Sequence, residues 1–408
     1  MLYRFVLALL LLSASWGAAA FETFNRIREQ GAVRIGVLAE HRNEPAVQRA
    51  RSFAETLGLA AEVQVFDRAD RLVDALRAAR IDLVGTPVDR NRPLAEGLRY
   101  TIPVDLASVR LAGRIGPVSV RYGSDAWHRA IAMRAAGRDL LLEVLPAETP
   151  YKALFQNPAR RVLSVGRSGP GSLLAADEPR SWVVRGDDRV LLFKLNRYLL
   201  STALLDDARD RQVVPSARLL RAYIGGALTD YDRLAQEYGR FYGFDWRLIL
   251  AVMNTESGFD PDAVSGSGAF GLMQLKPVAA REVGIPDVSL PRDNVLAGVR
   301  YLAWAFDQFE EDLPPLERTW FALAAYNGGY SRIREARRLA RVEGRNPRRW
   351  FGHVEHAVLD LGRRRSGFDA NQVVRYVQKV RSRFAEYARV TEGPAYRTDG
   401  PSSLTAAP

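Results

Sequence analysis

The chain has 408 residues, of which 47% are hydrophobic and 26% are charged. That length and composition exclude a disordered or fibrous chain and fit about two globular domains. The chain contains no cysteine, which excludes disulfides, a thiol nucleophile and a lipid anchor on an N-terminal cysteine. The formal net charge of +11 favours an anionic partner or serves solubility.

Residues 1–20 have the pattern of a secretory signal peptide. Arg4 precedes an apolar run over 5–12, and the small residues 18–20 form a cleavage site. The alternative is an uncleaved N-terminal anchor, for which the apolar run is short. We therefore expect an exported protein in the periplasm, where a chain without disulfides relies on its core.

Residues 21–210 are predicted to form an α/β domain, because short β patterns alternate with helical ones. This alternation is typical of a parallel sheet built from βαβ units. The charged segment 206–215 ends in a proline and indicates a domain boundary. The expected elements are strands at 32–38, 62–66 and 81–85 and helices at 44–57 and 69–79.

Residues 216–395 are predicted to form a mainly α domain. Apolar residues recur at helical spacing, and no strand pattern competes with them. The tail 396–408 is rich in Gly, Pro and Ser and is expected to be disordered. The expected helices cover 216–228, 230–242, 245–256, 294–309, 315–326, 331–340 and 372–387.

Glu256 is the candidate catalytic acid. Asp245 is placed to cap the helix, and Glu256 projects from near its apolar stripe. Burial and the negative end of the helix dipole both disfavour the carboxylate and raise its pKa. A raised pKa suits a general acid near neutral pH. The alternative is a glutamate at a helix end that reaches into solvent.

Three motifs follow one another at 256–257 (Glu-Ser), 271–274 (Gly-Leu-Met-Gln) and 325–329 (Ala-Tyr-Asn-Gly-Gly). In this order they resemble the catalytic domain of the soluble-lytic-transglycosylase family. The resemblance implies a goose-type lysozyme-like fold. It also implies cleavage of peptidoglycan at the bond between N-acetylmuramic acid and N-acetylglucosamine.

The first domain resembles type-two periplasmic solute-binding proteins of the amino-acid-receptor kind, in the stretches 33–40, 81–93 and 99–114. In such receptors an arginine after the third strand binds a ligand carboxylate, which here implies Arg92; a solvated loop arginine is the alternative. The domain is short for a complete receptor, so small-ligand or muropeptide binding stays open. The two domains in this order resemble the membrane-bound lytic murein transglycosylase F group.

The resemblance implies that Glu256 acts twice. It protonates the glycosidic oxygen, then accepts the proton of the muramyl 6-hydroxyl, which leaves a 1,6-anhydromuramyl end. Ordinary glycosidases use two carboxylates, but Asp260 and Asp262 flank a proline in the manner of turn residues. A hydrolase that releases reducing ends is one alternative. A catalytically weak peptidoglycan-binding or sensor protein is another.

The resemblance also implies supporting residues. Four of them are expected to form hydrogen bonds to the acetamido groups, the sugar ring or Glu256. Met273 is expected to form an apolar wall against a sugar face. Tyr376 is expected to hold Glu256 or the reacting sugar. For each, the alternative is a satisfied core side chain. The expected hydrogen-bonding residues are Ser257, Gln274, Tyr326 and Asn327. In one departure from the family pattern, Asn371 and Gln372 stand where a glutamate is usual, which questions a polar contact in the groove.

No metal, cofactor or nucleic acid is expected. His353 and His356 with Asp360 match no familiar metal motif and fit solvated histidines better. The basic segment Arg332–Arg365 lacks interleaved aromatic residues and a recognition-helix pattern, which argues against nucleic acid. Its expected partner is anionic cell-wall polymer or lipid head groups, with a peripheral position on the outer membrane; a solvated helical face is the alternative.

Overall fold

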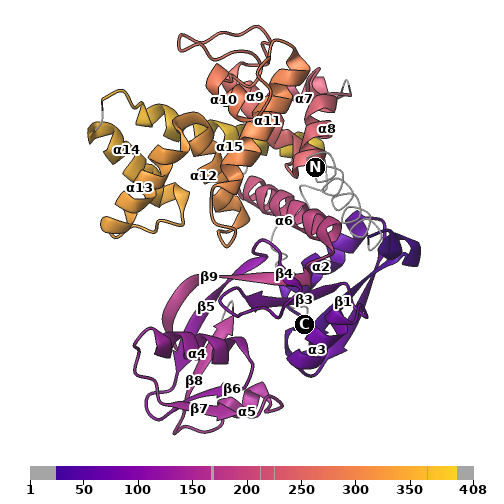
Figure 1. The fold of residues 1–408 in the computed structure, drawn as a ribbon, viewed down its shortest axis with the longest axis vertical. Coiled ribbons are helices and arrows are strands. Elements are labelled where there is room, and N and C mark those ends of the chain that lie inside the picture. Colours follow the sequence, from indigo (N-terminus) through magenta and orange to yellow (C-terminus); the bar gives the residue numbers. More distant parts are fainter. Residues whose placement is uncertain (1–23, 167–169, 212, 225, 365, 393–408) are drawn as a thin grey trace, which may run out of the picture. The chain divides into compact units, whose positions relative to one another are not determined.

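The structure, a computed structural model, describes residues 24–166, 170–211, 213–224, 226–364 and 366–392 (Figure 1). The predicted signal peptide and the predicted disordered tail lie outside these residues. The chain divides into two compact units, residues 1–198 and 199–408.

The first unit is built on one mixed sheet with the strand order β2-β1-β3-β9-β5-β8-β6-β7, and β4 pairs with β9. Two groups of parallel strands, β2-β1-β3 and β8-β6-β7, are joined through the antiparallel strands β9 and β5. The strands are β1 (Ala32–Leu38), β2 (Ala60–Phe66), β3 (Leu83–Asp89), β4 (Leu98–Tyr100), β5 (Asp105–Ala112), β6 (Val118–Arg121), β7 (Leu142–Leu145), β8 (Arg161–Gly166) and β9 (Ser172–Arg185).

Helices connect the parallel strands. In the first group, α2 (Pro45–Thr56) follows β1, and α3 (Ala69–Arg77) follows β2. In the second group, α4 (Asp125–Ala135) and the short α5 (Tyr151–Leu154) follow β6 and β7. The predicted α/β domain and its five predicted elements are therefore confirmed.

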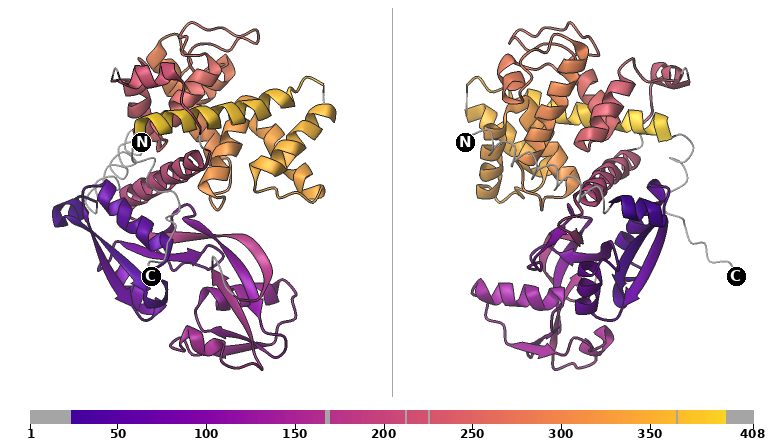
Figure 2. Two further views of the ribbon diagram at one scale, coloured as in Figure 1. Left: turned by 180° about the vertical axis from the view of Figure 1, so that it is seen from behind. Right: turned by 45° about the vertical axis from the view of Figure 1, so that its right-hand side comes forward.

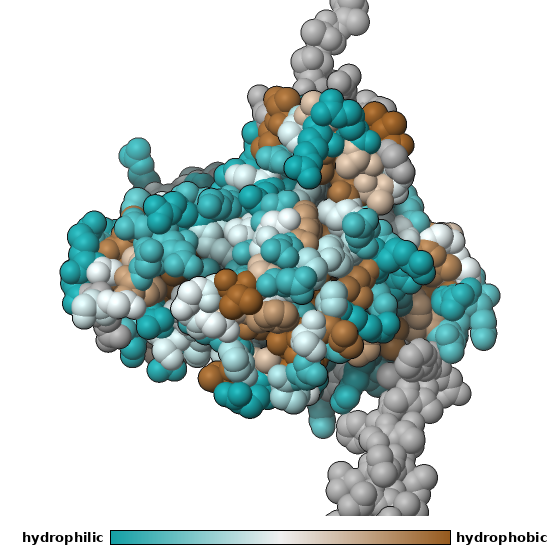
Figure 3. Space-filling view, turned by 90° about the horizontal axis from the view of Figure 1, so that it is seen from above, coloured by the Kyte–Doolittle hydropathy of each residue, from teal (hydrophilic) through white to brown (hydrophobic). Residues whose placement is uncertain are grey.

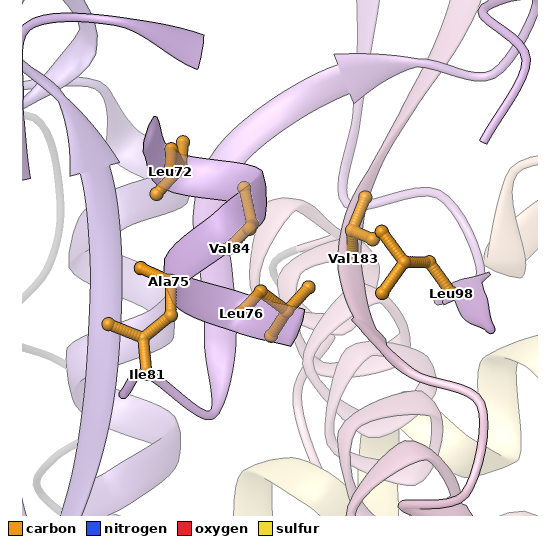
Figure 4. Close-up of a cluster of buried hydrophobic side chains, with 7 residues drawn as sticks. All are labelled: Leu72, Ala75, Leu76, Ile81, Val84, Leu98 and Val183. Carbon is orange, nitrogen blue, oxygen red and sulfur yellow. The ribbon is translucent and has the colours of Figure 1, made fainter. Parts of the chain in front are cut away.

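The core of the first parallel group lies between α3 and the sheet. Leu72 and Leu76 of α3 pack near Val84 of β3 and Val183 of β9 (Figure 4). Burial of one face of a helix against parallel strands is the arrangement that the alternation of patterns predicts.

Helix α6 (Arg189–Asp210) is continuous across the division between the units. Tyr198 contacts Phe53 of the first unit at 5.5 Å between ring centroids, whereas the Ser201 hydroxyl donates to Asp245 of the second. The sequence placed the boundary after this helix, at 206–215. The division instead falls inside the helix, because its two ends pack in different units.

The second unit is helical in its described residues, apart from two isolated β-bridges, Val264–Phe270 and Phe270–Leu275. The prediction of a mainly α domain is confirmed. Its helices are α7 (Ala217–Ile224), α8 (Asp232–Tyr242), α9 (Trp246–Glu256), α10 (Pro277–Glu282), α11 (Pro291–Asp307), α12 (Pro315–Gly328), α13 (Tyr330–Val342), the π-helical turn η2 (Trp350–Val354), α14 (Glu355–Arg364) and α15 (Ala370–Glu392).

Helix α9 is central to this unit. All seven residues from Arg247 to Met253 are buried, so the helix has no wet face over two turns. It packs against α8 and against α15, the long yellow helix of Figure 2. The last residue of this buried helix is Glu256.

Within the described residues, no helix is long and apolar enough to span a membrane. The face shown in Figure 3 mixes hydrophilic and hydrophobic residues without one continuous apolar area.

Candidate active site

The start of α9 is fixed by Asp245, as its sequence predicts. The Asp245 carboxylate accepts the backbone N–H of Arg247 at 2.9 Å and pairs with its guanidinium at 2.6 Å. Arg247 in turn pairs with Glu392 near the end of α15, at 2.8 Å. The cap at Asp245 and the ion pair from Arg247 to α15 fix the start of α9, and the helix then sets the position of Glu256 at its other end.

Glu256 is in an environment that favours its protonated form. Burial raises the pKa of this carboxyl from the ordinary 4.5 to about 7, and an interaction with the Tyr376 hydroxyl partly opposes the rise. Among the described residues, no second carboxylate contributes to this shift. The group therefore exchanges its proton near neutral pH, as a general acid must.

Two stacked tyrosines from different helices face Glu256. The rings of Tyr326 (α12) and Tyr376 (α15) lie 6.5 Å apart between centroids, with 4° between their planes. Burial first, and then the charge of Glu256, raises the pKa of both phenols, so both are neutral donors. The Tyr326 hydroxyl donates to the Met273 carbonyl at 2.8 Å, whereas the buried Tyr376 hydroxyl interacts with the Glu256 carboxyl.

The loop after α9 returns beneath these tyrosines and carries Gln274. This residue has a φ of 46°, in the left-handed region. Its side-chain nitrogen donates to the carbonyls of Ala263 and Gly271, at 2.9 Å each. Because both bonds use the amide nitrogen, the amide oxygen remains available as an acceptor.

Ser257 joins the end of α9 to the same loop. Its hydroxyl lies 3.0 Å from the Leu272 carbonyl and 3.2 Å from the Met253 carbonyl, and it accepts the N–H of Phe259 at 3.1 Å. The hydroxyl is thus committed to the protein backbone, the alternative that its sequence left open.

Met273 and Asn327 differ in what they expose. The Met273 side chain is fully buried, and it lies against Gly298 of α11 so closely that a Cβ at Gly298 would be 2.5 Å from it. The Met273 carbonyl accepts the hydrogen bond of the Tyr326 hydroxyl. Asn327 is half-buried, one residue beyond Tyr326.

Asn294, at the start of the helix predicted over 294–309, holds the loop in place. It lies in the first turns of α11 and is 1% exposed. Its oxygen accepts the N–H of Met273 at 2.8 Å, and its nitrogen donates to the carbonyls of Phe270 at 2.9 Å and Val288 at 3.3 Å. Gly271 is needed beside it, because a Cβ there would lie 2.4 Å from the Asn294 nitrogen, and its φ is +75°.

Comparisons with known proteins identify the family of this chain. Residues 233–347 match the family model described as "Transglycosylase SLT domain". The membrane-bound lytic murein transglycosylase F of Desulfosudis oleivorans is 30% identical over 385 residues, covering 81% of this chain and 82% of that protein. This chain belongs to the membrane-bound lytic murein transglycosylase F family.

Other members of the transglycosylase F family are similar over most of the chain. Those of Haemophilus influenzae and Alcanivorax borkumensis are 25% and 28% identical, and they cover 84% and 74% of this chain and 80% and 73% of their own lengths. The predicted family and enzyme class are confirmed.

Solved amino-acid-binding proteins match part of the chain. The ancestral amino acid-binding protein AncCDT-1 matches with a TM-score of 0.37 and 15% identity, over 44% of this chain and 93% of that one. Truncated, arginine-bound ArgBP from T. maritima matches with a TM-score of 0.34 and 16% identity, over 44% and 99%.

Arg92, His353, Asn371 and Gln372 are further residues that the sequence singled out. Arg92 pairs with Asp125 at 3.6 Å in the first unit. His353 accepts the N–H of Asn346 at 3.2 Å. The side chains of Asn371 and Gln372 are exposed at the start of α15.

The basic segment Arg332–Arg365 is partly neutralised within its own unit. Arg345 pairs with Asp360 at 3.0 Å, and Arg337 pairs with Glu310 at 2.8 Å. The expected anionic partner stays a prediction.

The raised pKa of Glu256 predicts a pH-dependent stability for this transglycosylase. Because the folded pKa of about 7 exceeds the ordinary 4.5, its stabilising contribution is complete below pH 4.5 and is lost as the pH rises through 7. A full shift corresponds to about 3 kcal/mol, and partial exposure of the side chain reduces this to about 2 kcal/mol.

Urea unfolding of the wild type and Glu256→Gln at pH 4.5 and pH 8 measures this contribution. The wild type should lose about 2 kcal/mol relative to the variant between the two pH values. Equal pH dependence in both proteins would show that Glu256 titrates normally.

Proposed function

We propose that this enzyme cleaves the β-1,4 bond between N-acetylmuramic acid and N-acetylglucosamine in peptidoglycan without water. Glu256 acts first as the acid and then as the base. The observation that carries this proposal is a single carboxyl whose burial raises its pKa to about 7 and which interacts with the Tyr376 hydroxyl. Asp260, the nearest acid in sequence, caps a turn by accepting the N–H of Asp262 at 3.0 Å.

In the first step, the protonated Glu256 donates to the glycosidic oxygen while the bond from that oxygen to the muramyl C1 breaks. The acetamido group of the same sugar supplies the electrons that stabilise positive charge at C1. In the second step, the muramyl 6-hydroxyl oxygen bonds to C1, and its proton returns to Glu256. The products are an N-acetylglucosamine end and a 1,6-anhydromuramyl end, and the enzyme recovers its proton.

The supporting residues have two proposed roles: some contact the substrate, and others position the residues that do. The Tyr376 hydroxyl can donate to the Glu256 carboxylate between the two steps, when that group carries its charge. Gln274, through its amide oxygen, and Asn327 offer hydrogen bonds to acetamido groups. Ser257, Met273 and Tyr326 are positioning residues, because their polar atoms bond within the protein.

The enzyme's place is the periplasm, where peptidoglycan lies, and its relatives carry "membrane-bound" in their names. Peripheral contact with the outer membrane through the basic segment Arg332–Arg365 belongs to this proposal. In the first unit, Arg92 would have to exchange its Asp125 partner for a ligand carboxylate if that unit binds a small ligand or muropeptide.

Digestion of purified sacculi, followed by mass spectrometry of the muropeptides, tests the reaction. We expect anhydromuramyl products, each lighter by one water than the corresponding reducing product. Reducing ends would instead identify a hydrolase. Sacculi that stay intact while the protein binds them would identify a glycan-binding or sensor protein.

A further inference from the structure

A series of aromatic rings leads away from Glu256. Tyr376 stacks on Tyr326, whose ring meets that of Tyr301 at 5.4 Å between centroids with 61° between the planes. Tyr301 then stacks on Trp304 at 5.2 Å and 15°. The series therefore passes from α15 through α12 to α11.

Exposure increases along this series. Tyr376 is 5% exposed, Tyr326 and Tyr301 are half-buried, and Trp304 is 39% exposed. Tyr301 and Trp304 are three residues apart on α11, so they lie on one face of the helix. The innermost rings lie close enough to Glu256 for its charge to raise the pKa of both phenols, and the outermost ring reaches solvent.

Trp304 is held from two sides. Tyr301 stacks on it, and the ring of Tyr330 on α13 meets it edge-on, at 6.4 Å and 75°. A tryptophan has few rotatable bonds, and these neighbours restrict them further. Little conformational entropy is then lost when a ligand binds to its open surface.

We propose that Trp304 is a sugar-stacking subsite of this enzyme, which binds a pyranose ring of the glycan strand beyond the sugars joined at the cleaved bond. This inference rests on the proposed function. The apolar C–H face of a pyranose packs well on an indole, and its hydroxyls stay in water at the rim. Because only the pyranose face is read, N-acetylglucosamine and N-acetylmuramic acid would both be accepted.

Steady-state cleavage of glycan strands tests the subsite. Without the indole ring, the apolar face of the bound pyranose stays exposed to water, which should weaken binding about tenfold. Trp304→Ala should therefore raise KM about tenfold and leave kcat nearly unchanged, since the ring does not touch the reacting atoms. Trp304→Phe, which keeps an aromatic face, should stay within about threefold of the wild type in KM.

Binding to N-acetylglucosamine oligomers of increasing length, followed by tryptophan fluorescence in a Glu256→Gln background, gives a second readout. The fluorescence change should appear only with oligomers long enough to reach Trp304 and should vanish in Trp304→Phe. Phe241→Ala, which removes a 73% exposed ring outside the series, is the matched control and should change neither KM nor binding.

The two proposals can fail separately. Unchanged KM and binding in Trp304→Ala, with anhydro products from the wild type, would overturn the subsite alone. Wild-type products without anhydro ends would overturn the lyase mechanism, while the length dependence of binding would still decide the subsite.

Discussion

Glu256→Gln is expected to lower the rate of peptidoglycan cleavage by at least about 10³-fold. The amide is nearly the same size as the carboxyl, but it cannot donate a proton to the glycosidic oxygen or accept one from the 6-hydroxyl. No second carboxylate contributes to the pKa of Glu256 within the described residues, so we expect none to replace it. Release of soluble muropeptides from labelled sacculi measures the loss.

A surface glutamate provides the matched control for that experiment. Glu237 is exposed and pairs with Arg292, so Glu237→Gln should retain full activity. In the wild type, kcat/KM should fall as the pH rises through about 7, because the acid must be protonated for the first step. Residual activity above about a tenth of wild type in Glu256→Gln would sink the assignment of the acid.

Asn294→Ala should reduce the free energy of unfolding of the second unit by about 3 kcal/mol, because it leaves a buried N–H and two carbonyls without their partner. The variant should also lose activity, since Met273 and Gln274 follow directly from the loop that Asn294 holds. Urea unfolding and sacculus digestion measure the two effects.

Asn371→Ala is the control for this substitution, because the same change is made at an exposed position. Its stability should stay within about 0.5 kcal/mol of the wild type. If Asn294→Ala were equally mild, the hydrogen bonds of Asn294 would not be what holds the loop.

The part of the site that could be predicted from sequence is local. Asp245 and Glu256 belong to one helix. The capping residue predicts where that helix begins, and the spacing of its apolar residues predicts which face Glu256 lies near. The role of Asn294 could not be predicted from sequence, because its partners Met273 and Phe270 lie 21 and 24 residues earlier in the chain. The motif resemblance singled out Met273, but a motif cannot tell whether its side chain or its carbonyl meets Tyr326.

In the first unit, too, only local structure could be predicted from the sequence. Alternating patterns predicted the strands and helices around β1, β2 and β3, because each pattern spans few residues. The long antiparallel pairing of β5 with β9 has no local period that would reveal it, since the partners are distant in the chain.

The burial of α9 on all sides has a consequence for how the enzyme moves. A helix enclosed over seven residues opens only when its whole unit unfolds, so its amides belong to the slowest-exchanging class. The exposed segment 266–268, in the loop after α9, is expected to have fast-exchanging amides. We therefore expect the motion that admits a glycan strand to come from the loop, while α9, which carries the proposed acid at its end, stays folded.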